Sequence, residues 1–183
     1  MRRNADGHST GVRSDRSFGV SDTPMRKIIV EAEVSIDGAM GGENAEFWKR
    51  VFPLHSPDVQ QYLNDLLFMP DALLLGQRTF SFFASVWPTR PGREADRINA
   101  MPKYVASRTL KEQPGGPLLQ YGIGALTHTM LTHGLVDELR LLVYPFAFGD
   151  GPRIFDHMGA HTLKLLETRT FDSGVVALHY QVG

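Results

Sequence analysis

The chain has 183 residues, of which 42% are hydrophobic and 21% charged, so it is long and apolar enough to form one folded domain. Its 19 basic and 20 acidic side chains give a formal net charge of −1, which argues against a nucleic-acid partner. It contains no cysteine, which excludes disulfides, thiolate metal sites and a cysteine nucleophile, and makes a reducing cytoplasm the expected location.

The first 24 residues differ in composition from the rest of the chain. They are rich in Gly, Ser, Asp and Arg, and they lack the continuous apolar stretch of a secretory signal. Because such a segment buries too little surface to offset its ordering entropy, we expect a disordered extension over 1–24 and one domain over 25–183. The longest apolar run, 141–148, is far too short to cross a bilayer, so no membrane partner is expected.

The pattern of apolar and turn-forming residues predicts alternating strands and helices. In chain order, we expect a strand over 27–34, a helix starting at Ser56-Pro57-Asp58, a strand over 72–75, helices over 77–86 and 93–101, strands over 103–107 and 118–121, a helix from Gly124 to Gly134, a long strand over 136–148, and a hairpin of 163–171 and 175–182. This order predicts a three-layer α-β-α domain with a mixed, mostly parallel central sheet and a C-terminal antiparallel hairpin.

Three of the expected strands run directly into residues that suit phosphate binding. They are followed by Gly76-Gln77-Arg78-Thr79, by Ser107-Arg108-Thr109 and by Gly122-Ile123-Gly124. In an open α/β sheet, ligands bind at the carboxyl ends of the strands, where helix N-termini offer free N–H groups and a positive partial charge. Glycine lets a ligand approach the backbone, and arginine pairs with phosphate oxygens. Together the three junctions favour a dinucleotide ligand.

Each junction also has a simpler interpretation. A glycine after a strand is usually a turn residue, and an arginine such as Arg78 or Arg108 is most often a solvated surface residue. None of the three matches the strict Gly-x-Gly-x-x-Gly fingerprint, of which Gly122-Ile123-Gly124 is only a partial form. Spacing alone therefore leaves both a ligand site and ordinary turns open.

As a set, the motifs resemble the dihydrofolate-reductase-like superfamily, and within it the bacterial branch related to the C-terminal reductase domain of riboflavin biosynthesis. The resemblance covers about residues 25–182 and rests on the motifs in their order along the chain. They are Ser35-Ile-Asp37-Gly38, Leu75-Gly-Gln-Arg-Thr-Phe80, Asn99 to Thr109, Gly122-Ile-Gly-Ala-Leu126, Gly134-Leu-Val-Asp-Glu-Leu139 and Phe148 to Phe155. These motifs are specific for a fold and much less specific for a substrate.

The resemblance implies that the strand ends hold the phosphates of a nicotinamide cofactor. Gly76, Arg78 and Thr79 would hold the pyrophosphate at a helix start. Ser107 and Arg108 would lie beside the adenosine ribose and favour its extra phosphate, which means NADPH over NADH.

The same resemblance implies where the reacting rings would lie. Gly122, Ile123 and Gly124 would pass close under the nicotinamide half of the cofactor, and Ala32 to Asp37 would border the nicotinamide and the substrate. The cofactor would supply a hydride to a carbon–nitrogen double bond or a carbonyl, while the protein aligns the rings and excludes water.

The chain departs from the family pattern in two places. Similar proteins commonly carry arginine where this chain has Gln77, so one phosphate-pairing cation is missing. The segment 108–117 is only ten residues long and includes Pro114-Gly115-Gly116-Pro117, where family members carry a further strand and most of a helix. Either a segment is absent from the sequence, or the domain has lost a strand and part of its cofactor wall.

Two acids are candidates for protonating the substrate. Asp58 lies at the start of the helix that faces the pocket in such folds, although an acid there also stabilises a helix dipole. Asp37 lies in the Ser-x-Asp-Gly turn, where it is equally suited to forming the turn. The histidine pairs His128/His133 and His157/His161 lack a third ligand pattern, so no metal site is expected.

These observations lead to one main hypothesis and one alternative. The main hypothesis is an NADPH-dependent reductase of a small heterocycle, such as a pteridine- or pyrimidine-like ring. The alternative is a nucleotide-binding module that has kept the fold and lost turnover, which Gln77 and the short 108–117 segment favour. The C-terminal hairpin leaves an exposed sheet edge, which predicts a symmetric homodimer.

Overall fold

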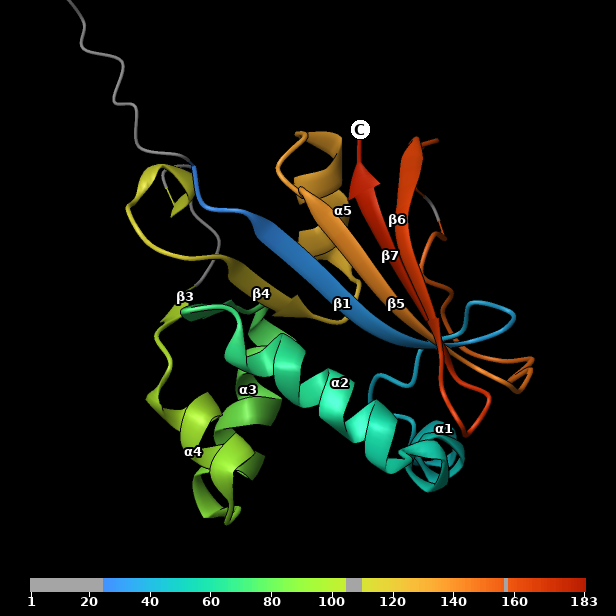
Figure 1. Ribbon diagram of the computed structural model, residues 1–183. Helices are drawn as coiled ribbons and strands as arrows, with labels where there is room; N and C mark the ends of the chain where they lie inside the picture. The colour runs from blue at the N-terminus through green and yellow to red at the C-terminus, as the bar shows by residue number, and fades with distance from the viewer. Residues whose placement is uncertain (1–24, 105–109, 157) are drawn as a thin grey trace, which may run out of the picture.

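A computed structural model describes residues 25–104, 110–156 and 158–183 of the chain. Seven strands form one mixed sheet in the order β3-β2-β4-β1-β5-β7-β6, and helices cover both of its faces (Figure 1). This is the predicted three-layer α/β architecture. Within the described ranges, no helix has both the length and the apolar character needed to span a membrane.

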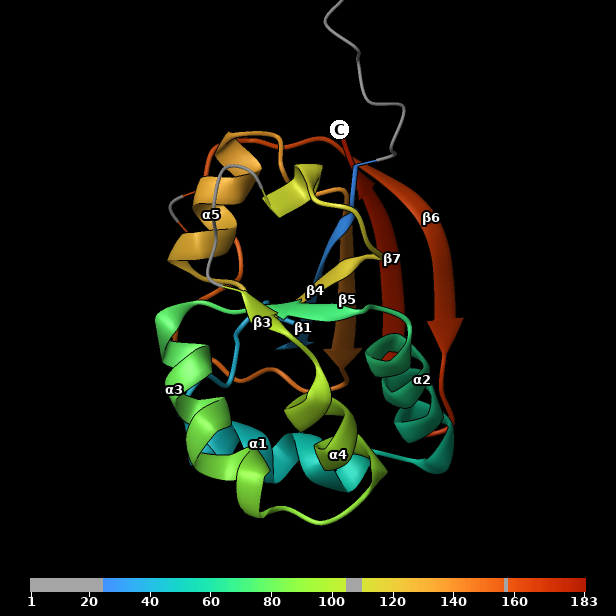
Figure 2. The same ribbon diagram turned by 90° about the vertical axis from the view of Figure 1, so that its left-hand side faces the viewer.

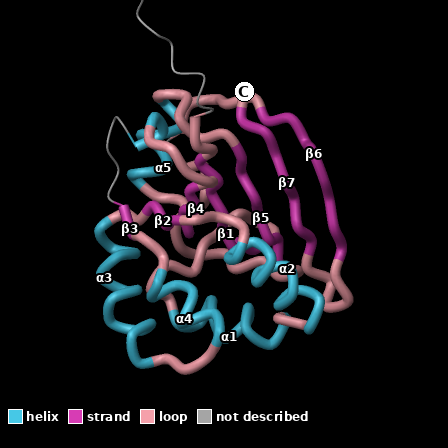
Figure 3. Tube along the Cα trace, turned by 60° about the vertical axis from the view of Figure 1, so that its left-hand side comes forward, coloured by secondary structure: helices cyan, strands magenta, loops and turns pink. Residues whose placement is uncertain are grey.

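Five strands form the parallel part of the sheet, and two add an antiparallel edge. The strands are β1 (Ile28–Ser35), β2 (Ala72–Leu74), β3 (Lys103–Tyr104), β4 (Leu118–Tyr121), β5 (Glu138–Tyr144), β6 (Leu163–Thr170) and β7 (Val176–Val182). The central strand β1 pairs in parallel with both β4 and β5. β7 runs antiparallel to β5, and β6 pairs with β7 as the last strand of the sheet (Figure 3).

The helices are divided unequally between the two faces of the sheet. They are α1 (Ala45–Val51), α2 (Pro57–Phe68), α3 (Gln77–Val86), α4 (Arg93–Ala100) and α5 (Ala125–Thr132), with short 3-10 turns η1 (Phe52–Leu54), η2 (Trp87–Thr89) and η3 (Leu110–Glu112). Figure 2 shows α5 on one side of the sheet and α1 to α4 on the other. Each face therefore has its own hydrophobic core.

Strand β1 contributes alternate residues to these two faces, as a period of two requires. Val30 and Ala32 face the core that includes Met130 and Leu131 of α5. Ile29 faces the other core, which includes side chains from α2, α3 and α4. β1 is therefore buried on both faces, and Glu33 is the one residue of the strand that is only partly buried.

The structure differs from the sequence prediction in two segments, 45–54 and 136–148. Residues 45–54 form α1 and η1, which the sequence analysis did not predict, and Phe47 and Val51 of α1 are fully buried against β5. The long strand expected over 136–148 is wrong in length, because β5 ends at Tyr144. Pro145 follows and has no N–H for the ladder, and the Phe146 N–H donates back to the Tyr144 carbonyl at 2.8 Å.

The Pro-Gly-Gly-Pro segment 114–117 is held by an ion pair between Arg26, which precedes β1, and Asp71, which precedes β2. Arg26 is buried and pairs with Asp71, and its Nε donates to the Gly116 carbonyl at 2.7 Å. The Gly116 N–H donates to Asp71 Oδ2 at 2.6 Å. Of the residues that connect β3 to β4, those that are described form the single turn η3 and this loop. A short crossover is therefore fixed at its end by specific polar contacts.

Candidate functional site

The connections after β2 and β4 leave the sheet in opposite directions. These two strands are neighbours, paired in parallel at Ala72 with Leu118. β2 leads into α3, which packs Phe83 into the core on the α2 side, whereas β4 leads into α5 on the other side. The carboxyl ends of neighbouring parallel strands whose connections diverge in this way are where α/β proteins bind ligands, and we call this place between β2 and β4 the crevice.

Two glycines at this crevice have no structural need to be glycine. Gly76 is the N-cap of α3 with a φ of −71°, and a Cβ placed on it would be in ordinary contact with Leu126 at 3.9 Å. Gly124 is the N-cap of α5 with extended backbone, and a Cβ there would have no atom of the described residues within 4 Å. By contrast, Gly122 has a φ of +75°, which favours glycine for conformational reasons. The missing side chains at 76 and 124 leave the backbone open to a ligand.

The loop between β4 and α5 is held in place by two buried polar side chains, Gln120 and Thr127. Gln120 Nε2 donates to the Gly122 carbonyl at 3.1 Å and to Thr127 Oγ1, which in turn accepts from the Gly124 N–H at 3.2 Å. Both side chains are buried, while Gly122 and Gly124 are exposed and Ile123 is buried between them. The backbone of this loop is therefore held in place before any ligand binds.

Of the other predicted cofactor residues, three are described by the structure and two are not. Arg78 and Thr79 are in the first turn of α3, with Arg78 exposed, and Gln77 begins that helix. Ala32 is in β1, buried on the α5 face. Ser107 and Arg108 lie outside the described residues, although β3, which precedes them, is paired in parallel with β2. The ends of β3, β2 and β4 are thus adjacent in the sheet.

Asp37 fastens the turn after β1 to the segment after β5. Its Oδ1 accepts from Ser35 Oγ at 2.5 Å and from the Phe148 N–H at 3.0 Å, and its Oδ2 accepts from the Gly149 N–H at 2.9 Å. These hydrogen bonds, the one from Ser35 foremost, hold the pKa of the Asp37 carboxyl below its ordinary value. The group is an anion at neutral pH, whereas a general acid must carry a proton.

Asp58 joins the start of α2 to the turn of the C-terminal hairpin. It accepts from Ser56 Oγ at 2.5 Å, from the Val59 N–H and, across the fold, from the Asp172 N–H at 3.0 Å. These hydrogen bonds, led by that from Ser56, lower the pKa of Asp58. Its geometry is that of a helix-start acid that also anchors a distant turn.

Two glutamates on β1 were not among the site residues predicted from the sequence. Glu31 and Glu33 lie on the face of β1 that α2 covers, two residues apart, and Glu31 is only 2% exposed. Burial, together with the neighbouring Glu33, raises the pKa of the Glu31 carboxyl well above its ordinary value. The available signal was two acids at alternate positions in a strand that is otherwise apolar on both faces. A buried, proton-holding carboxyl is a typical feature of functional sites.

Glu33 is part of a compact polar cluster with His55 and Tyr144. The Tyr144 hydroxyl lies 3.0 Å from Glu33 Oε2 and 2.8 Å from His55 Nε2, and His55 Nε2 lies 3.4 Å from Glu33 Oε2. Tyr144 is fully buried, while the side chains of His55 and Glu33 are 18% and 15% exposed. The cluster therefore reaches from the surface to the buried end of β1.

Aromatic side chains and unsatisfied polar atoms lie on the same side of the sheet as Glu31. Tyr62, Trp87 and Tyr121 pack against the core of this side, and Phe83 contacts both Trp87 and Tyr121 with ring centroids 5.8 Å apart. Within the described part of the chain, four buried side-chain atoms on this side of the sheet have no hydrogen-bond partner. They are Glu31 Oε1, Trp87 Nε1, Arg140 Nε and Arg97 Nε of α4. Such atoms carry a free-energy cost unless a ligand or water satisfies them.

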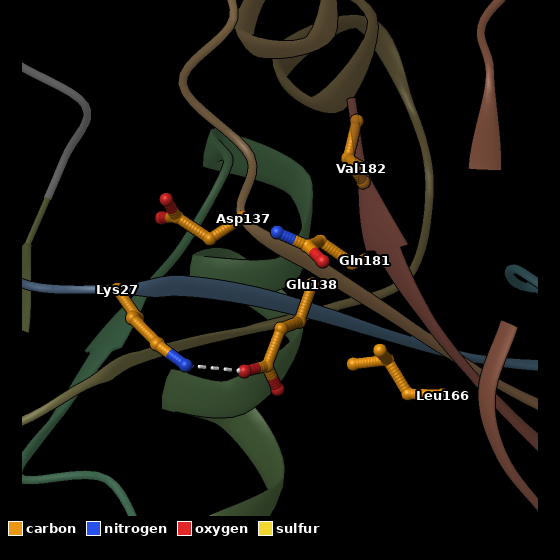
Figure 4. Close-up of a pocket in the computed structure, with 6 residues that line it drawn as sticks. All are labelled: Lys27, Asp137, Glu138, Leu166, Gln181 and Val182. Carbon is orange, nitrogen blue, oxygen red and sulfur yellow. Dashed lines mark hydrogen bonds and ion pairs between the residues drawn. The ribbon is translucent and has the colours of Figure 1, made fainter. Parts of the chain in front are cut away.

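A groove at the other end of the strands, away from the crevice, is lined mainly by charged and polar side chains. It lies at the amino ends of β1 and β5 and is lined by Lys27, Asp137, Glu138, Leu166, Gln181 and Val182 (Figure 4). The Glu138 carboxylate there contacts Lys27 at 2.9 Å, His179 at 2.8 Å and Arg140 at 3.2 Å. Its charges are already paired within the protein, so this groove is not the candidate site.

The sheet order and the crevice define an α/β protein with the dihydrofolate reductase fold. The dihydrofolate reductase of Enterococcus faecalis, whose structure was determined with NADP(H), matches with a TM-score of 0.53 and 13% identity, over 86% of this chain and 96% of that one. The riboflavin biosynthesis reductase Rib7 of Saccharomyces cerevisiae matches with a TM-score of 0.56 and 12% identity, over 88% of this chain and 92% of that one. At these identities the likeness shows the fold.

Sequence matches place the chain within this fold. The model of the RibD C-terminal domain matches residues 26–120 and 108–177. The uncharacterized protein YyaP of Bacillus subtilis (strain 168) is 31% identical over 184 residues, which covers 85% of this chain and 95% of that protein. The chain therefore belongs to the RibD C-terminal domain family, which confirms the resemblance drawn from the motifs and supports an oxidoreductase role.

Proposed function

We propose that this protein is an NADPH-dependent reductase of a small heterocycle, a pteridine- or pyrimidine-like ring. The observation that carries the proposal is the crevice between β2 and β4, where two helices begin side by side at glycines that the fold itself does not require. Two helix N-termini provide free N–H groups and positive partial charge for a diphosphate. The reductases named above share this fold, and one of them was determined with NADP(H).

The residues of the crevice divide into a phosphate end and a nicotinamide end. Gly76, Arg78 and Thr79 would hold the pyrophosphate at the start of α3, and the loop 122–124 and the β1 backbone at Ala32 would border the nicotinamide. Ser107 and Arg108 keep the role that the resemblance gives them, beside the adenosine phosphate. When bound, the cofactor supplies the hydride, and the chain's own residues orient the two rings and exclude water.

The substrate ring would lie on the α2 side of β1, in contact with the unsatisfied atoms. Glu31 Oε1 is an acceptor, whereas Arg140 Nε and Trp87 Nε1 are donors. A planar heterocycle carrying both N–H donors and acceptor atoms satisfies such a set, and the faces of Tyr62 and Tyr121 suit a flat ring. This complementarity supports a pteridine- or pyrimidine-like substrate over an aliphatic one.

A direct test follows NADPH oxidation with a panel of pteridines and aminopyrimidines. Hydride transfer is measured as loss of the reduced nicotinamide absorbance, with product mass gaining two hydrogen atoms. Turnover of at least one ring substrate is expected. Saturable NADPH binding with no turnover across the panel would favour the alternative, a nucleotide-binding module that has lost turnover, to which the exposed Gln77 and the short β3-to-β4 connection point.

We further propose that the protein is a homodimer and acts in the cytoplasm. β6 is the outermost strand of the sheet, and seven of its eight residues are exposed. An edge strand of this length presents unpaired backbone groups that a second copy can cover. The absence of cysteine supports a reducing compartment. Light scattering should give twice the chain mass, and a monomeric mass would exclude the dimer.

A further inference from the structure

We infer that Glu31 is the acid that protonates the substrate and that His55, acting through Glu33, supplies protons to it from solvent. The inference rests on the proposed function, because it names the acid of the same site and the route by which that acid is protonated again. It differs from the assignment drawn from the sequence, in which Asp37 and Asp58 were the candidates.

The three residues form a path of decreasing exposure. His55, at the end of η1, is 18% exposed in its side chain, Glu33 is 15% exposed, and Glu31 is 2% exposed. Glu33 and Glu31 follow one another on the same face of β1, because side chains alternate along a strand. The path therefore runs from the surface down one face of the central strand to the buried carboxyl.

The outer half of the path has hydrogen-bonding geometry. Tyr144 donates its hydroxyl proton to Glu33 Oε2 at 3.0 Å, and its oxygen lies 2.8 Å from His55 Nε2. His55 Nε2 also approaches Glu33 Oε2 at 3.4 Å. An imidazole ring can both accept and donate a proton, and the His55 side chain is the most exposed of the three groups, so it is placed to exchange protons with solvent. Tyr144 fixes the spacing of the other two groups.

Ionisable groups of three neighbouring elements lie along the inner half of the path. They are Tyr62 of α2, Tyr121 of β4, and Arg140 and Tyr144 of β5. Burial, and secondarily the two glutamates, raises the pKa of Tyr121 and Tyr144, so both phenols stay neutral. Arg140 is the register neighbour of Glu31, yet no ion pair joins them in the structure as described. With two carboxyls and no neutralising partner at Glu31, one proton is retained within the pair.

The proposed step balances in atoms and electrons. When bound, the reduced nicotinamide would supply a hydride to the carbon of the substrate C=N bond, and the Glu31 carboxyl would give its proton to the nitrogen. The π bond breaks, one C–H and one N–H bond form, and the substrate gains two electrons as the nicotinamide is oxidised. Glu31 is then a carboxylate, and in the proposed route it regains a proton that passes from solvent by way of His55 and Glu33.

The first test uses the protein without cofactor, so its outcome is independent of turnover. Infrared difference spectroscopy at neutral pH should show the carbonyl band of a protonated carboxylic acid, and this band should be absent from Glu31→Gln. The exposed Glu43→Gln should keep the band. If the wild-type protein lacks it at neutral pH, Glu31 holds no proton and the inference fails.

The second test compares the pH dependence of hydride transfer in matched histidine variants. His55→Gln should lower the rate about tenfold to a hundredfold at neutral pH without changing the NADPH dissociation constant, and added imidazole should restore much of the loss. Tyr144→Phe, which keeps the buried ring, should give a smaller loss in the same direction. His161→Gln, on an exposed loop, should match the wild type.

The outcomes of these tests separate the inference from the function on which it rests. If wild-type protein binds NADPH and turns over, but His55→Gln has an unchanged rate and pH profile, the proton route is wrong and the reductase stands. If no NADPH binding occurs, the proposed function fails, while the infrared band of Glu31 still reports whether the buried acid holds its proton.

Discussion

Leu126 at the start of α5 lies directly beside Gly76 at the start of α3: a Cβ placed on Gly76 would be 3.9 Å from the Leu126 Cβ. The two residues are 50 positions apart in the sequence. They meet because β2 and β4 are neighbouring parallel strands whose following helices leave toward opposite faces. This juxtaposition brings two helix N-termini to one crevice, and it is the structural basis of the proposed cofactor site.

The first prediction concerns the two glycines that the fold does not require. Gly76→Val and Gly124→Val should each weaken NADPH binding by about tenfold or more, because the new side chain would occupy the space of the ligand. The free energy of unfolding should change by about 0.5 kcal/mol or less at Gly124, where the added atoms have open space. Gly159→Val, in a loop with equally open space, is the matched control and should leave the affinity unchanged.

The second prediction concerns the exposed arginine of α3. Arg78→Gln should raise the NADPH dissociation constant about tenfold at low ionic strength, because a charge-assisted hydrogen bond to a phosphate is lost. The ratio to wild type should shrink at high salt, since an exposed charge is screened. Arg50→Gln, which removes an exposed arginine from the end of α1, should have no effect on calorimetric affinity at either salt concentration.

The third prediction concerns the pH dependence of stability at Glu31. Its raised pKa means that the folded state binds a proton that the unfolded state releases above about pH 4.3, so the wild-type protein loses stability as the pH rises from there toward the folded pKa. Glu31→Gln cannot ionise. Its melting temperature should therefore match the wild type at low pH and exceed it increasingly toward neutral pH, by about 2–4 °C for each kcal/mol. A melting-temperature difference that does not vary with pH would contradict the buried-acid assignment.

The fourth prediction concerns the loop that Arg26 and Asp71 hold. Gly115 has a φ of +146°, and a Cβ on it would lie 2.9 Å from Asp71 Oδ2 and 3.1 Å from the Arg26 guanidinium carbon. Gly115→Ala should cost about 1–3 kcal/mol in thermal unfolding. The adjacent Gly116→Ala places its Cβ 3.4 Å from Asp71 and should cost less. Equal losses in both variants would show that the ion pair does not define the loop.

The sequence predicted most of the fold because its turn and apolar signals are local. The helix over 77–86 and the strand over 118–121 occur with the expected bounds, since glycines mark one end of each. α1 was missed because its buried residues, Phe47 and Val51, are only one turn apart in a segment otherwise rich in polar and loop-forming residues. The end of β5 at Tyr144 was missed because the apolar residues continue past the point where Pro145 ends the ladder.

The candidate site was harder to predict because it depends on contacts between distant segments. The strand-end glycines could be recognised from local sequence, but which of them the fold needs depends on φ angles and on the space around each. Asp37 and Asp58 have the sequence features of acids near a site, yet hydrogen bonds from residues more than 100 positions away fix them as anions. Glu31 has no motif, and only its burial beneath α2 reveals its chemistry.

Calorimetric titration of the protein with NADPH tests the central claim most directly. The account predicts saturable binding of one cofactor per chain. Gly76→Val and Gly124→Val should each weaken this binding, although the two glycines follow different strands, β2 and β4. If NADPH gives no heat of binding at millimolar concentration, or binds equally well when both glycines are replaced, the crevice between β2 and β4 is not a cofactor site.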